Sequence, residues 1–202
     1  MAVCQPHRVR PTTTTYALLG LLAIRSWSTY ELAKQIDRSL GWFWPRTERK
    51  IYDEAKRLVA AGLATASAEP VGKRRRTVYS ITPAGRRELT KWLARPSQPM
   101  KLESEGLVRV FFADGGDLEQ LRATLQGFHQ QAEGRLEVLR SMIEALDDDD
   151  FRARLPINAL GLRFQLDQHQ AASSWARWAL DQIDEWNGVD DPGEWNWRRA
   201  LS

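Results

Sequence analysis

Two groups of side chains in the first half of the sequence could bind a polyanion. The first group lies within residues 46–57 and consists of Arg46, Thr47, Arg49, Lys50, Lys56 and Arg57. The second group is an unbroken basic run, Lys73, Arg74, Arg75 and Arg76. Arginine can form two hydrogen bonds to a guanine in the major groove, and lysine and arginine both neutralise phosphates. These residue types therefore predict a surface that binds duplex DNA.

A helix followed by a hairpin would hold both groups in place. The apolar residues of 46–63 recur at helical spacing and form one stripe, made of Ile51, Ala55, Leu58 and Val59. Charged residues lie on or beside the opposite face, namely Arg49, Asp53, Lys56 and Arg57. Gly62 tolerates the left-handed conformation in which many helices end. Residues 64–68 and 77–81 are expected to pair as strands across a turn at Gly72, so that the second group forms the tip of a basic wing.

Further helices would complete a small DNA-binding domain. Residues 16–24 are apolar enough for a buried first helix. Ser28 and Glu31 can cap a second helix reciprocally, and its apolar face would carry Leu32, Ile36 and Leu40 before Gly41 ends it. Thr82 and Pro83 begin another helix, which is expected to run to about residue 94. The order helix, helix, helix, hairpin, helix predicts a winged helix-turn-helix domain at residues 12–95.

The second half of the sequence predicts long helices. Residues 96–99, with two prolines, mark a boundary. Apolar residues between Leu118 and Leu146 recur at steps of three and four, which predicts a helix of about 30 residues, about 45 Å long, with a heptad-like seam. Asp147–Asp150 would end this helix. A last helix, from about Pro156 to Trp186, is apolar on two faces. One face carries Leu160, Phe164, Ala171, Trp175 and Trp178, and the other carries Leu162, Leu166, Ala176, Leu180 and Ile183.

A helix that is apolar on two faces must be covered on both. The sequence offers few other elements for this purpose, so we expect a second copy of the chain to supply the cover. Residues 101–187 would then form a helical dimerisation domain in a homodimer. The expected interface residues are Leu118, Leu121, Leu125, Phe128, Leu162, Leu166, Trp175 and Leu180. The fold class is therefore mainly α, an N-terminal winged helix-turn-helix plus a C-terminal long-helix dimerisation domain.

Charge is divided unevenly along the 202 residues. Residues 1–100 contain 18 Lys and Arg against 7 Asp and Glu, whereas residues 101–202 contain 11 against 19. The first half thus has a net charge of +11 and the second half −8. Because a polyanion would attract the first half and repel the second, only the first half is expected to meet DNA.

Several other functions are disfavoured by the sequence. Cys4 is the only cysteine, which excludes an internal disulfide and a multi-cysteine metal site. The first 15 residues lack the apolar core of a secretory signal, and residues 16–24 are far shorter than the roughly 20 apolar residues that span a membrane. We find no nucleophile–base pair, no metal-ligand spacing and no glycine-rich phosphate loop, so an enzyme is not expected. The sequence predicts a soluble, cytoplasmic protein with no cofactor and no membrane partner.

The sequence resembles the PadR family of bacterial transcriptional regulators. The matching motifs, in the order and spacing of that family, are ALLGLL at 17–22, YEL at 30–32, FWP at 43–45, IY at 51–52, KRL at 56–58, AGL at 61–63, RTVY at 76–79 and ITPAG at 81–85. The motif FFAD at 111–114 and the long second half resemble the longer branch of the family, whose last helices build the dimer. Asp53 stands where that family often has proline.

The resemblance implies a homodimeric regulator, usually a repressor, that leaves its DNA operator when a small aromatic or lipophilic molecule binds. It adds Tyr52 to the expected DNA-binding residues, with its hydroxyl holding a phosphate. Trp92, Trp175 and Trp178 could stack on such an effector in a pocket at the dimer interface.

Each of these sites also has a plainer interpretation. The basic run could be a solvated turn, and some basic residues of 46–57 could simply face solvent; Arg57 could instead pair with Glu54. Each tryptophan could belong to the hydrophobic core. His129 and His169 lack a second ligand at metal spacing, so interface histidines are expected and no metal. A winged-helix adaptor that binds only protein is the main rival function. Residues 188–202, with Trp195 and Trp197, form a tail whose order the sequence does not decide.

Overall fold

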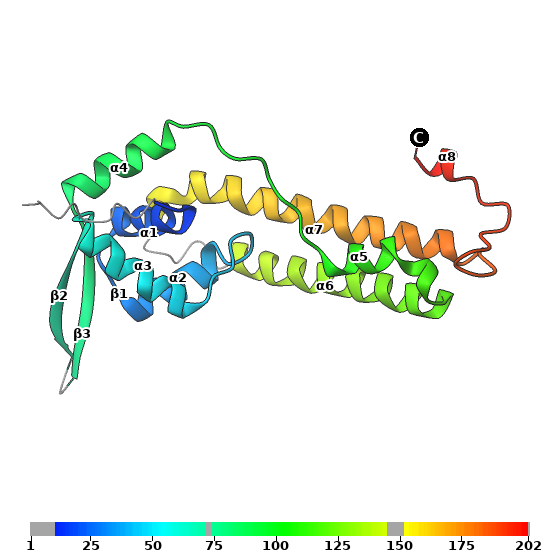
Figure 1. The fold of residues 1–202 in the computed structure, drawn as a ribbon, viewed down its shortest axis with the longest axis horizontal. Coiled ribbons are helices and arrows are strands. Elements are labelled where there is room, and N and C mark those ends of the chain that lie inside the picture. Colours follow the sequence, from blue (N-terminus) through cyan, green and yellow to red (C-terminus); the bar gives the residue numbers. More distant parts are fainter. Residues whose placement is uncertain (1–10, 72–73, 145–151, 202) are drawn as a thin grey trace, which may run out of the picture. The chain divides into compact units, whose positions relative to one another are not determined.

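The chain folds into two compact units, and the division between them falls between Pro99 and Met100. The structure, a computed structural model, describes residues 11–71, 74–144 and 152–201 (Figure 1). The N-terminal unit contains α1 Thr13–Ile24, β1 Trp27–Ser28, α2 Thr29–Ser39, α3 Glu48–Ala60, β2 Ala64–Val71, β3 Arg74–Ile81 and α4 Pro83–Leu93. The C-terminal unit contains α5 Glu105–Phe111, η1 Ala113–Gly115, α6 Leu118–Glu144, η3 Arg152–Arg154, α7 Leu155–Ile183 and α8 Trp197–Ala200. The predicted mainly helical class, with an N-terminal winged helix-turn-helix and long C-terminal helices, is confirmed.

The core of the N-terminal unit is built around α1. Leu18, Leu19 and Leu22 are fully buried because α3, α4 and β3 all pack against this helix. Leu32 from α2 and Ile51 from α3 complete the core. Burying a leucine or isoleucine side chain contributes about 1.5–3 kcal/mol, so these residues fix the positions of α2 and α3 relative to α1.

Local capping signals set the ends of these helices. Ser28 and Glu31 form the predicted capping box, since the Glu31 amide donates to Ser28 Oγ at 3.3 Å and the Ser28 amide donates to Glu31 Oε2 at 2.7 Å. Thr82 caps α4, whose first residue is Pro83. Gly62 follows α3 with a φ of 70°, the left-handed conformation expected at that position. Helix α2 ends slightly earlier than predicted, at Ser39.

The strands form an antiparallel sheet in the order β1-β3-β2. The hairpin of β2 and β3 is longer than predicted, because its pairing extends from Ala64 opposite Ile81 to Val71 opposite Arg74. It projects away from α1, α2 and α3 as a wing (Figure 1). Strand β1 was not predicted from the sequence. Trp27 pairs with Tyr79 there, and its buried indole donates a hydrogen bond to the Leu21 carbonyl at 2.8 Å.

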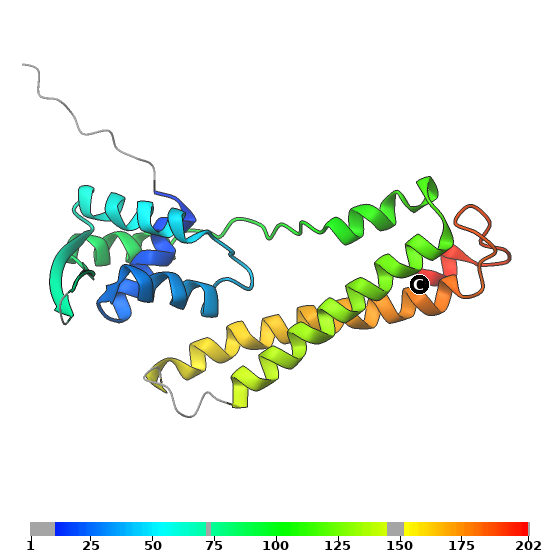
Figure 2. The same cartoon turned by 90° about the horizontal axis from the view of Figure 1, so that it is seen from below.

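The C-terminal unit consists mainly of α6 and α7, which lie side by side along their length (Figures 1 and 2). Leu121, Leu125, Ala179 and Ile183 form a buried cluster between them. Helix α6 is described to Glu144 over 27 residues; the rest of its predicted length, with Asp147–Asp150, lies outside the described residues. Helix α7 ends at Ile183, three residues before the predicted Trp186. None of the described helices is long and apolar enough to cross a membrane.

The two apolar faces of α7 have different surroundings. Ala176 and Ile183 of one face are buried, and Leu180 packs against the cluster that α6 and α7 share. On the other face, Leu160 and Phe164 remain exposed within a single chain. Several residues of the predicted dimer interface are therefore covered by the chain itself, because they lie in or against the α6–α7 core. These are Leu118, Leu121, Leu125, Trp175 and Leu180.

The segment after α7, whose order the sequence left undecided, contacts the end of that helix in the part that the structure describes. The amides of Asn187 and Gly188 donate to the Asp191 carbonyl at 3.0 and 3.2 Å, which turns the chain back after α7. Trp195 then lies edge-on to Trp186, with ring centroids 5.2 Å apart. Its indole donates to Gln182 Oε1 at 3.0 Å. The segment after α7 is thus attached to the C-terminal end of that helix.

Candidate nucleic-acid interface

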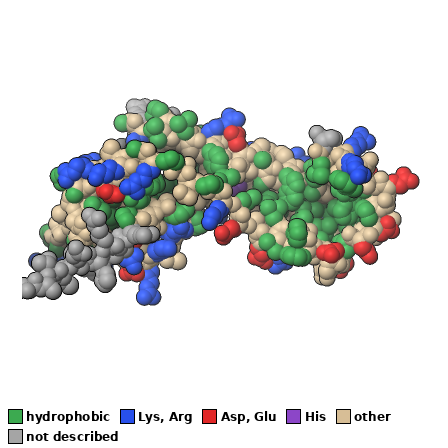
Figure 3. All heavy atoms as spheres, turned by 45° about the horizontal axis from the view of Figure 1, so that its top comes forward, with side chains coloured by type: hydrophobic (Ala, Val, Ile, Leu, Met, Phe, Trp, Pro, Cys, Tyr) green, Lys and Arg blue, Asp and Glu red, His purple; other side chains and the backbone are tan. Residues whose placement is uncertain are grey.

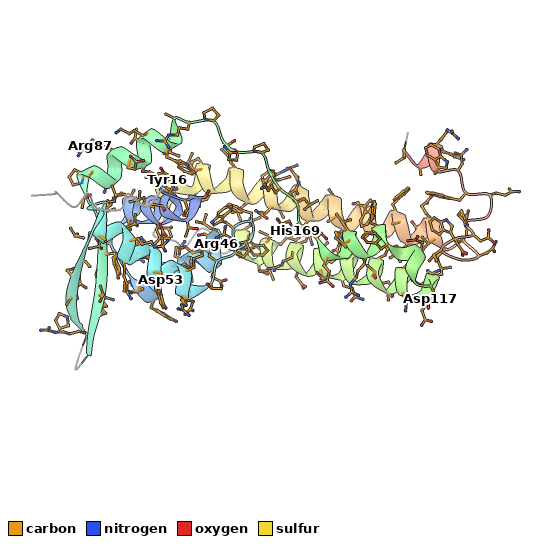
Figure 4. All side chains as sticks on the ribbon, in the orientation of Figure 1. Tyr16, Arg46, Asp53, Arg87, Asp117 and His169 are labelled. Atoms are coloured by element: carbon orange, nitrogen blue, oxygen red, sulfur yellow. The ribbon has the colours of Figure 1, made fainter. Side chains whose placement is uncertain are left out.

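Helix α3 buries one face and presents the other to solvent. Thr47 caps its N-terminus by accepting a hydrogen bond from the Lys50 amide at 3.4 Å. The buried face consists of Ile51, Glu54, Ala55 and Leu58, and Val59 is half-buried beside it. The exposed face carries Arg49, Lys50, Asp53, Lys56 and Arg57, and Figure 4 labels Asp53 on this helix. The predicted basic residues of α3 thus share one surface, with Asp53 among them.

Glu54 belongs to the buried face although its side chain carries a carboxylate. The residue is 5% exposed, and its Oε1 accepts a hydrogen bond from the Thr15 hydroxyl of α1 at 2.5 Å. This contact ties α3 to α1 by a polar link inside an apolar core. From the sequence, Glu54 is expected only as a partner for Arg57. Its spacing from Ile51, Ala55 and Leu58 was the signal that could have placed it on the buried stripe.

Arg57 is paired with Glu54 but remains accessible. One guanidinium nitrogen lies 3.5 Å from Glu54 Oε2, and the arginine side chain is 58% exposed. The expected pairing of Arg57 with Glu54 is therefore present. Because the carboxylate is buried and the guanidinium is not, Glu54 can orient Arg57 while leaving its outer N–H groups open to a phosphate or base.

Arg46 lies immediately before α3 and is held by several contacts. Its guanidinium carbon is 3.9 Å from the centre of the Trp44 ring. Its Nη1 donates to the Pro45 carbonyl at 2.6 Å, and its Nε donates to Thr14 Oγ1 at 3.4 Å (Figure 4). These contacts restrict the side chain, so Arg46 has less freedom to adapt to a nucleic acid than the exposed residues of α3.

Tyr52 is linked to the carboxylate one helical turn before it. Its hydroxyl donates to Glu48 Oε2 at 3.3 Å. Loss of hydration, and then the negative charge and hydrogen bond of Glu48, raise the pKa of Tyr52 above its usual value. The hydroxyl therefore stays protonated and available as a donor. A phosphate would have to replace Glu48 as its acceptor.

The wing carries less free positive charge than its sequence suggests. Arg75 is exposed, but the guanidinium of Arg76 lies 3.1 Å from Glu69 Oε2 on β2 and 3.9 Å from Glu31 Oε1 on α2. Hydrogen bonds from Ser28, and to a smaller extent the charge of Arg76, lower the pKa of Glu31. Arg74 begins β3, and Lys73 lies outside the described residues.

The predicted effector tryptophans fall in both units. Trp92, on α4, stacks on Tyr16 with ring centroids 4.7 Å apart and planes 6° from parallel. In the C-terminal unit, Trp175 meets Phe128 edge-on at 5.2 Å. Trp178 is 40% exposed and, with Trp175, lines a cavity of about 400 Å³. The structure therefore brings Trp175 and Trp178 together, whereas Trp92 has an aromatic partner in the winged-helix unit.

His129 takes part in a polar contact between α6 and α7. The buried Ser173 hydroxyl donates to Glu133 Oε1 at 2.5 Å and lies 3.1 Å from His129 Nδ1. The hydrogen bond from Ser173 is the main reason that the pKa of Glu133 is lowered. Burial lowers the pKa of His169 on the same helix as Ser173 (Figure 4). Within the described residues, no three side chains of His, Cys, Asp or Glu gather in a way that could hold a metal ion.

Both units match known protein families. Residues 18–91 match the transcriptional regulator PadR-like family, and residues 104–184 match the Virulence activator alpha C-term family. The negative transcriptional regulator PadR of Bacillus subtilis (strain 168) is 28% identical over 133 residues, covering 65% of this chain and 73% of PadR. Probable transcriptional regulator Rv1176c of Mycobacterium tuberculosis is 34% identical over 87 residues, covering 43% of this chain and 46% of the relative.

The fold of most of the chain is also similar to solved structures. Bacillus subtilis PadR in complex with operator DNA has a TM-score of 0.76 at 24% identity, covering 85% of this chain and 99% of that chain. The same protein in complex with p-coumaric acid has a TM-score of 0.70 at 24% identity, covering 86% of this chain and 100% of that chain. The solved structures share the fold of this chain, and the matches along the sequence show that it carries a domain of the PadR-like family of transcriptional regulators followed by a C-terminal domain of the virulence activator alpha type.

Proposed function

We propose that the chain is a sequence-specific DNA-binding regulator that acts in the cytoplasm as a homodimer, as a repressor that a small aromatic or lipophilic effector releases from its operator. The main support for DNA binding comes from the outer face of α3, where four basic residues are exposed, namely Arg49, Lys50, Lys56 and Arg57. The opposite face of the same helix is locked into the core by Ile51 and Leu58. A rigid helix with a basic outer face has the form that enters a major groove.

The wing and the family support the same assignment. Arg75 and the neighbouring basic residues of the hairpin would contact phosphate beside the groove that α3 reads. In a homodimer, two copies of α3 about 34 Å apart would reach successive major grooves of a near-palindromic operator. One relative is named a negative regulator and has been solved with operator DNA, which supports both the repressor role and the DNA partner.

The effector part of the proposal rests on different observations. The relative that was solved with DNA has also been solved with p-coumaric acid, a small aromatic molecule. In this chain, Trp175 and Trp178 lie on the wall of a cavity inside the C-terminal unit. Tyr16 covers one face of the Trp92 ring, so only the rest of that ring could contact a ligand.

A mobility-shift titration tests the DNA-binding proposal. The duplex is the region upstream of the chain's own gene, and a random duplex of equal length is the comparison. We expect the double variant Arg49→Ala and Lys56→Ala to lose roughly tenfold or more of its affinity for the upstream duplex, since one base contact contributes about 1–3 kcal/mol. Arg163→Ala, which removes an exposed arginine from α7, should bind like the unmodified chain.

The affinity should also fall steeply as salt rises from about 50 to 200 mM, because phosphate binding releases counterions. A shift that ignores salt would contradict phosphate binding. A shift that ignores the double variant would remove α3 as the reading helix.

A further inference from the structure

A cavity inside the C-terminal unit has the properties of a ligand site. It has a volume of about 400 Å³ and lies among α5, α6, α7 and the segment that follows α7. Its floor is the buried cluster of Leu121, Leu125 and Ile183. A cavity of this size, with an apolar floor and a few polar groups on its wall, is within the range of small-molecule sites in proteins.

Four tryptophans form much of the wall, namely Trp175, Trp178, Trp186 and Trp195. Three of them are held in place: Trp175 by Phe128, and Trp186 and Trp195 by each other. The hydrogen bond from Trp195 to Gln182 fixes the segment after α7 as the last part of the wall. Trp178 is 40% exposed and leaves ring surface open to a ligand. Rings held in this way favour a flat aromatic partner, because little further side-chain freedom is lost on binding.

Trp186 also presents an unused hydrogen-bond donor. Its Nε1 is buried and has no hydrogen-bond partner among the residues that the structure describes. The great majority of buried N–H groups in proteins have a hydrogen-bond partner, so an unpaired one on the wall of a cavity favours a ligand that supplies an acceptor. A ligand with an acceptor atom in or on its ring would supply it.

The charge of the wall limits the ligand further. Among the described residues that line the cavity, Asp114 carries a carboxylate and none is a lysine or arginine. The surrounding half of the sequence has an excess of acidic residues. Figure 3 shows hydrophobic side chains gathered on this part of the molecule, with several Asp and Glu side chains and some Lys and Arg side chains near the edge of the gathering. An anionic ligand would meet Asp114 without a cation to offset the repulsion.

From these observations we infer that the cavity binds a flat aromatic molecule that is neutral or positively charged, and that Trp186 Nε1 donates to a ring acceptor where the ligand has one. This inference rests on the effector part of the proposed function and names its site and ligand class. It also separates this chain from the relative solved with p-coumaric acid, since that acid carries a carboxyl group.

Three probes with the same ring system test the charge requirement by isothermal titration calorimetry at pH 8. Acridine is neutral with a ring-nitrogen acceptor, 9-aminoacridine is a cation, and acridine-9-carboxylate is an anion. Acridine and 9-aminoacridine should bind, and the carboxylate should bind at least about fivefold more weakly, the effect of one like charge at about 4 Å in water. Asp114→Asn should restore about that factor for the carboxylate alone. Equal binding of all three, or tightest binding of the carboxylate, would overturn the inference.

Variants of the tryptophans test the location. Trp178→Ala should weaken acridine binding about three- to tenfold, because stacking contacts contribute about 0.5–1.5 kcal/mol. Trp186→Phe keeps a ring but removes the donor, so it should weaken acridine and leave 9-aminoacridine, whose ring nitrogen is protonated, nearly unchanged. Trp197→Ala is the matched control, since Trp197 is 52% exposed in the same C-terminal segment and does not line the cavity. If all three variants bind acridine alike, or if acridine does not bind the unmodified chain, the site is wrong.

The test separates this inference from the rest of the proposed function, because calorimetry needs no DNA. If the chain binds acridine but shifts no duplex, the ligand site is supported and the DNA-binding proposal is wrong. If the chain binds both acridine and DNA, and acridine leaves its affinity for the operator unchanged, the ligand site is supported and the proposal of effector release is wrong.

Discussion

At the scale of single residues, the polar contacts of α3 explain how its basic face is held. Glu54 occupies a position that helical spacing assigns to the core, and Thr15 and Arg57 satisfy its carboxylate there. The carboxylate therefore has two roles. It joins the reading helix to α1, and it anchors an arginine whose other end is free to contact DNA.

Replacing Glu54 with alanine should destabilise the N-terminal unit. The Thr15 hydroxyl would lose its acceptor inside the core, and leaving one buried polar group unpaired costs about 1–3 kcal/mol. Thermal unfolding should therefore show a lower midpoint. Asp53→Ala changes a neighbouring, exposed carboxylate on the same helix and should shift stability by less than about 0.5 kcal/mol. Equal midpoints for the two variants would show that the Glu54 contact does not stabilise the fold.

The positions of most candidate site residues followed from the sequence, but their partners did not. Helical spacing placed Arg49, Lys56 and Arg57 opposite the apolar stripe, and α3 exposes all three. Spacing carries no information on a partner that is distant in the chain. The contacts between Thr15 and Glu54, and between Glu31 and Arg76, join residues that are 39 and 45 positions apart, so they depend on how the elements pack.

At the scale of secondary-structure elements, the wing carries both its positive charges and a carboxylate that offsets one of them. Glu69 and Arg76 face each other on β2 and β3, since they are paired in the strand register. Opposite charges at directly paired positions stabilise an antiparallel hairpin by about 0.2–1 kcal/mol. The same pairing reduces the charge that the wing can offer to a phosphate.

Changing Glu69 to glutamine should strengthen binding to DNA of any sequence. Arg76 would lose its closest negative partner and could neutralise a phosphate instead, which would steepen the salt dependence by up to about 0.9 in the logarithmic slope. The measurement is random-duplex affinity at several salt concentrations. Glu119→Gln makes the same charge change at an exposed position on α6 and serves as the control. If both variants gain affinity equally, net charge and not the wing would be responsible.

Element boundaries were predictable where a capping signal was present. Ser28, Thr82 and Gly62 marked helix ends that the structure confirms. Strand β1 has two residues and depends on pairing with β3, so no local pattern in the sequence predicts it. The hairpin is longer than predicted for a similar reason. Its outer part has polar and charged residues, and cross-strand pairing determines its length.

At the scale of the whole molecule, the two-faced α7 remains the main argument for a homodimer. One face is used within the chain, against α6. The other exposes Ile157, Leu160 and Phe164, which are 63%, 71% and 45% accessible. The three positions lie within one side of the helix, because the steps between them are three and four residues. Apolar side chains in a row of this kind favour an interface.

The double variant Leu160→Asp and Phe164→Asp should convert a homodimer to monomers. Two buried charges at an apolar interface would have no partners, whereas the single-chain core does not include either side chain. Sedimentation velocity measures the assembly state, and the helical circular dichroism signal should be unchanged. Gln170→Asp, at an exposed position away from this row, should leave the dimer intact. A double variant that sediments like the unmodified chain would move the interface elsewhere.

The sequence could predict that α7 needs cover on two faces, but it could not say which face belongs to its own chain. Leu162, Leu166 and Leu180 were expected at the dimer interface together with α6 residues such as Leu121 and Leu125. Hydrophobic periodicity is the same for a helix that packs within its chain and for one that packs on a copy. Only the placement of α6 beside α7 separates the two cases.

The attachment of Trp195 to Gln182 has a genetic consequence. A stop codon shortly after Ile183 would spare the core leucines of α6 and α7 and the whole winged helix, yet it would delete Trp186 and Trp195. If the proposed effector release is right, such an allele should give a folded protein that still occupies its promoter but no longer responds to an inducer. Dominant, uninducible mutants selected in the cell should therefore include truncations clustered shortly after the codon for Ile183.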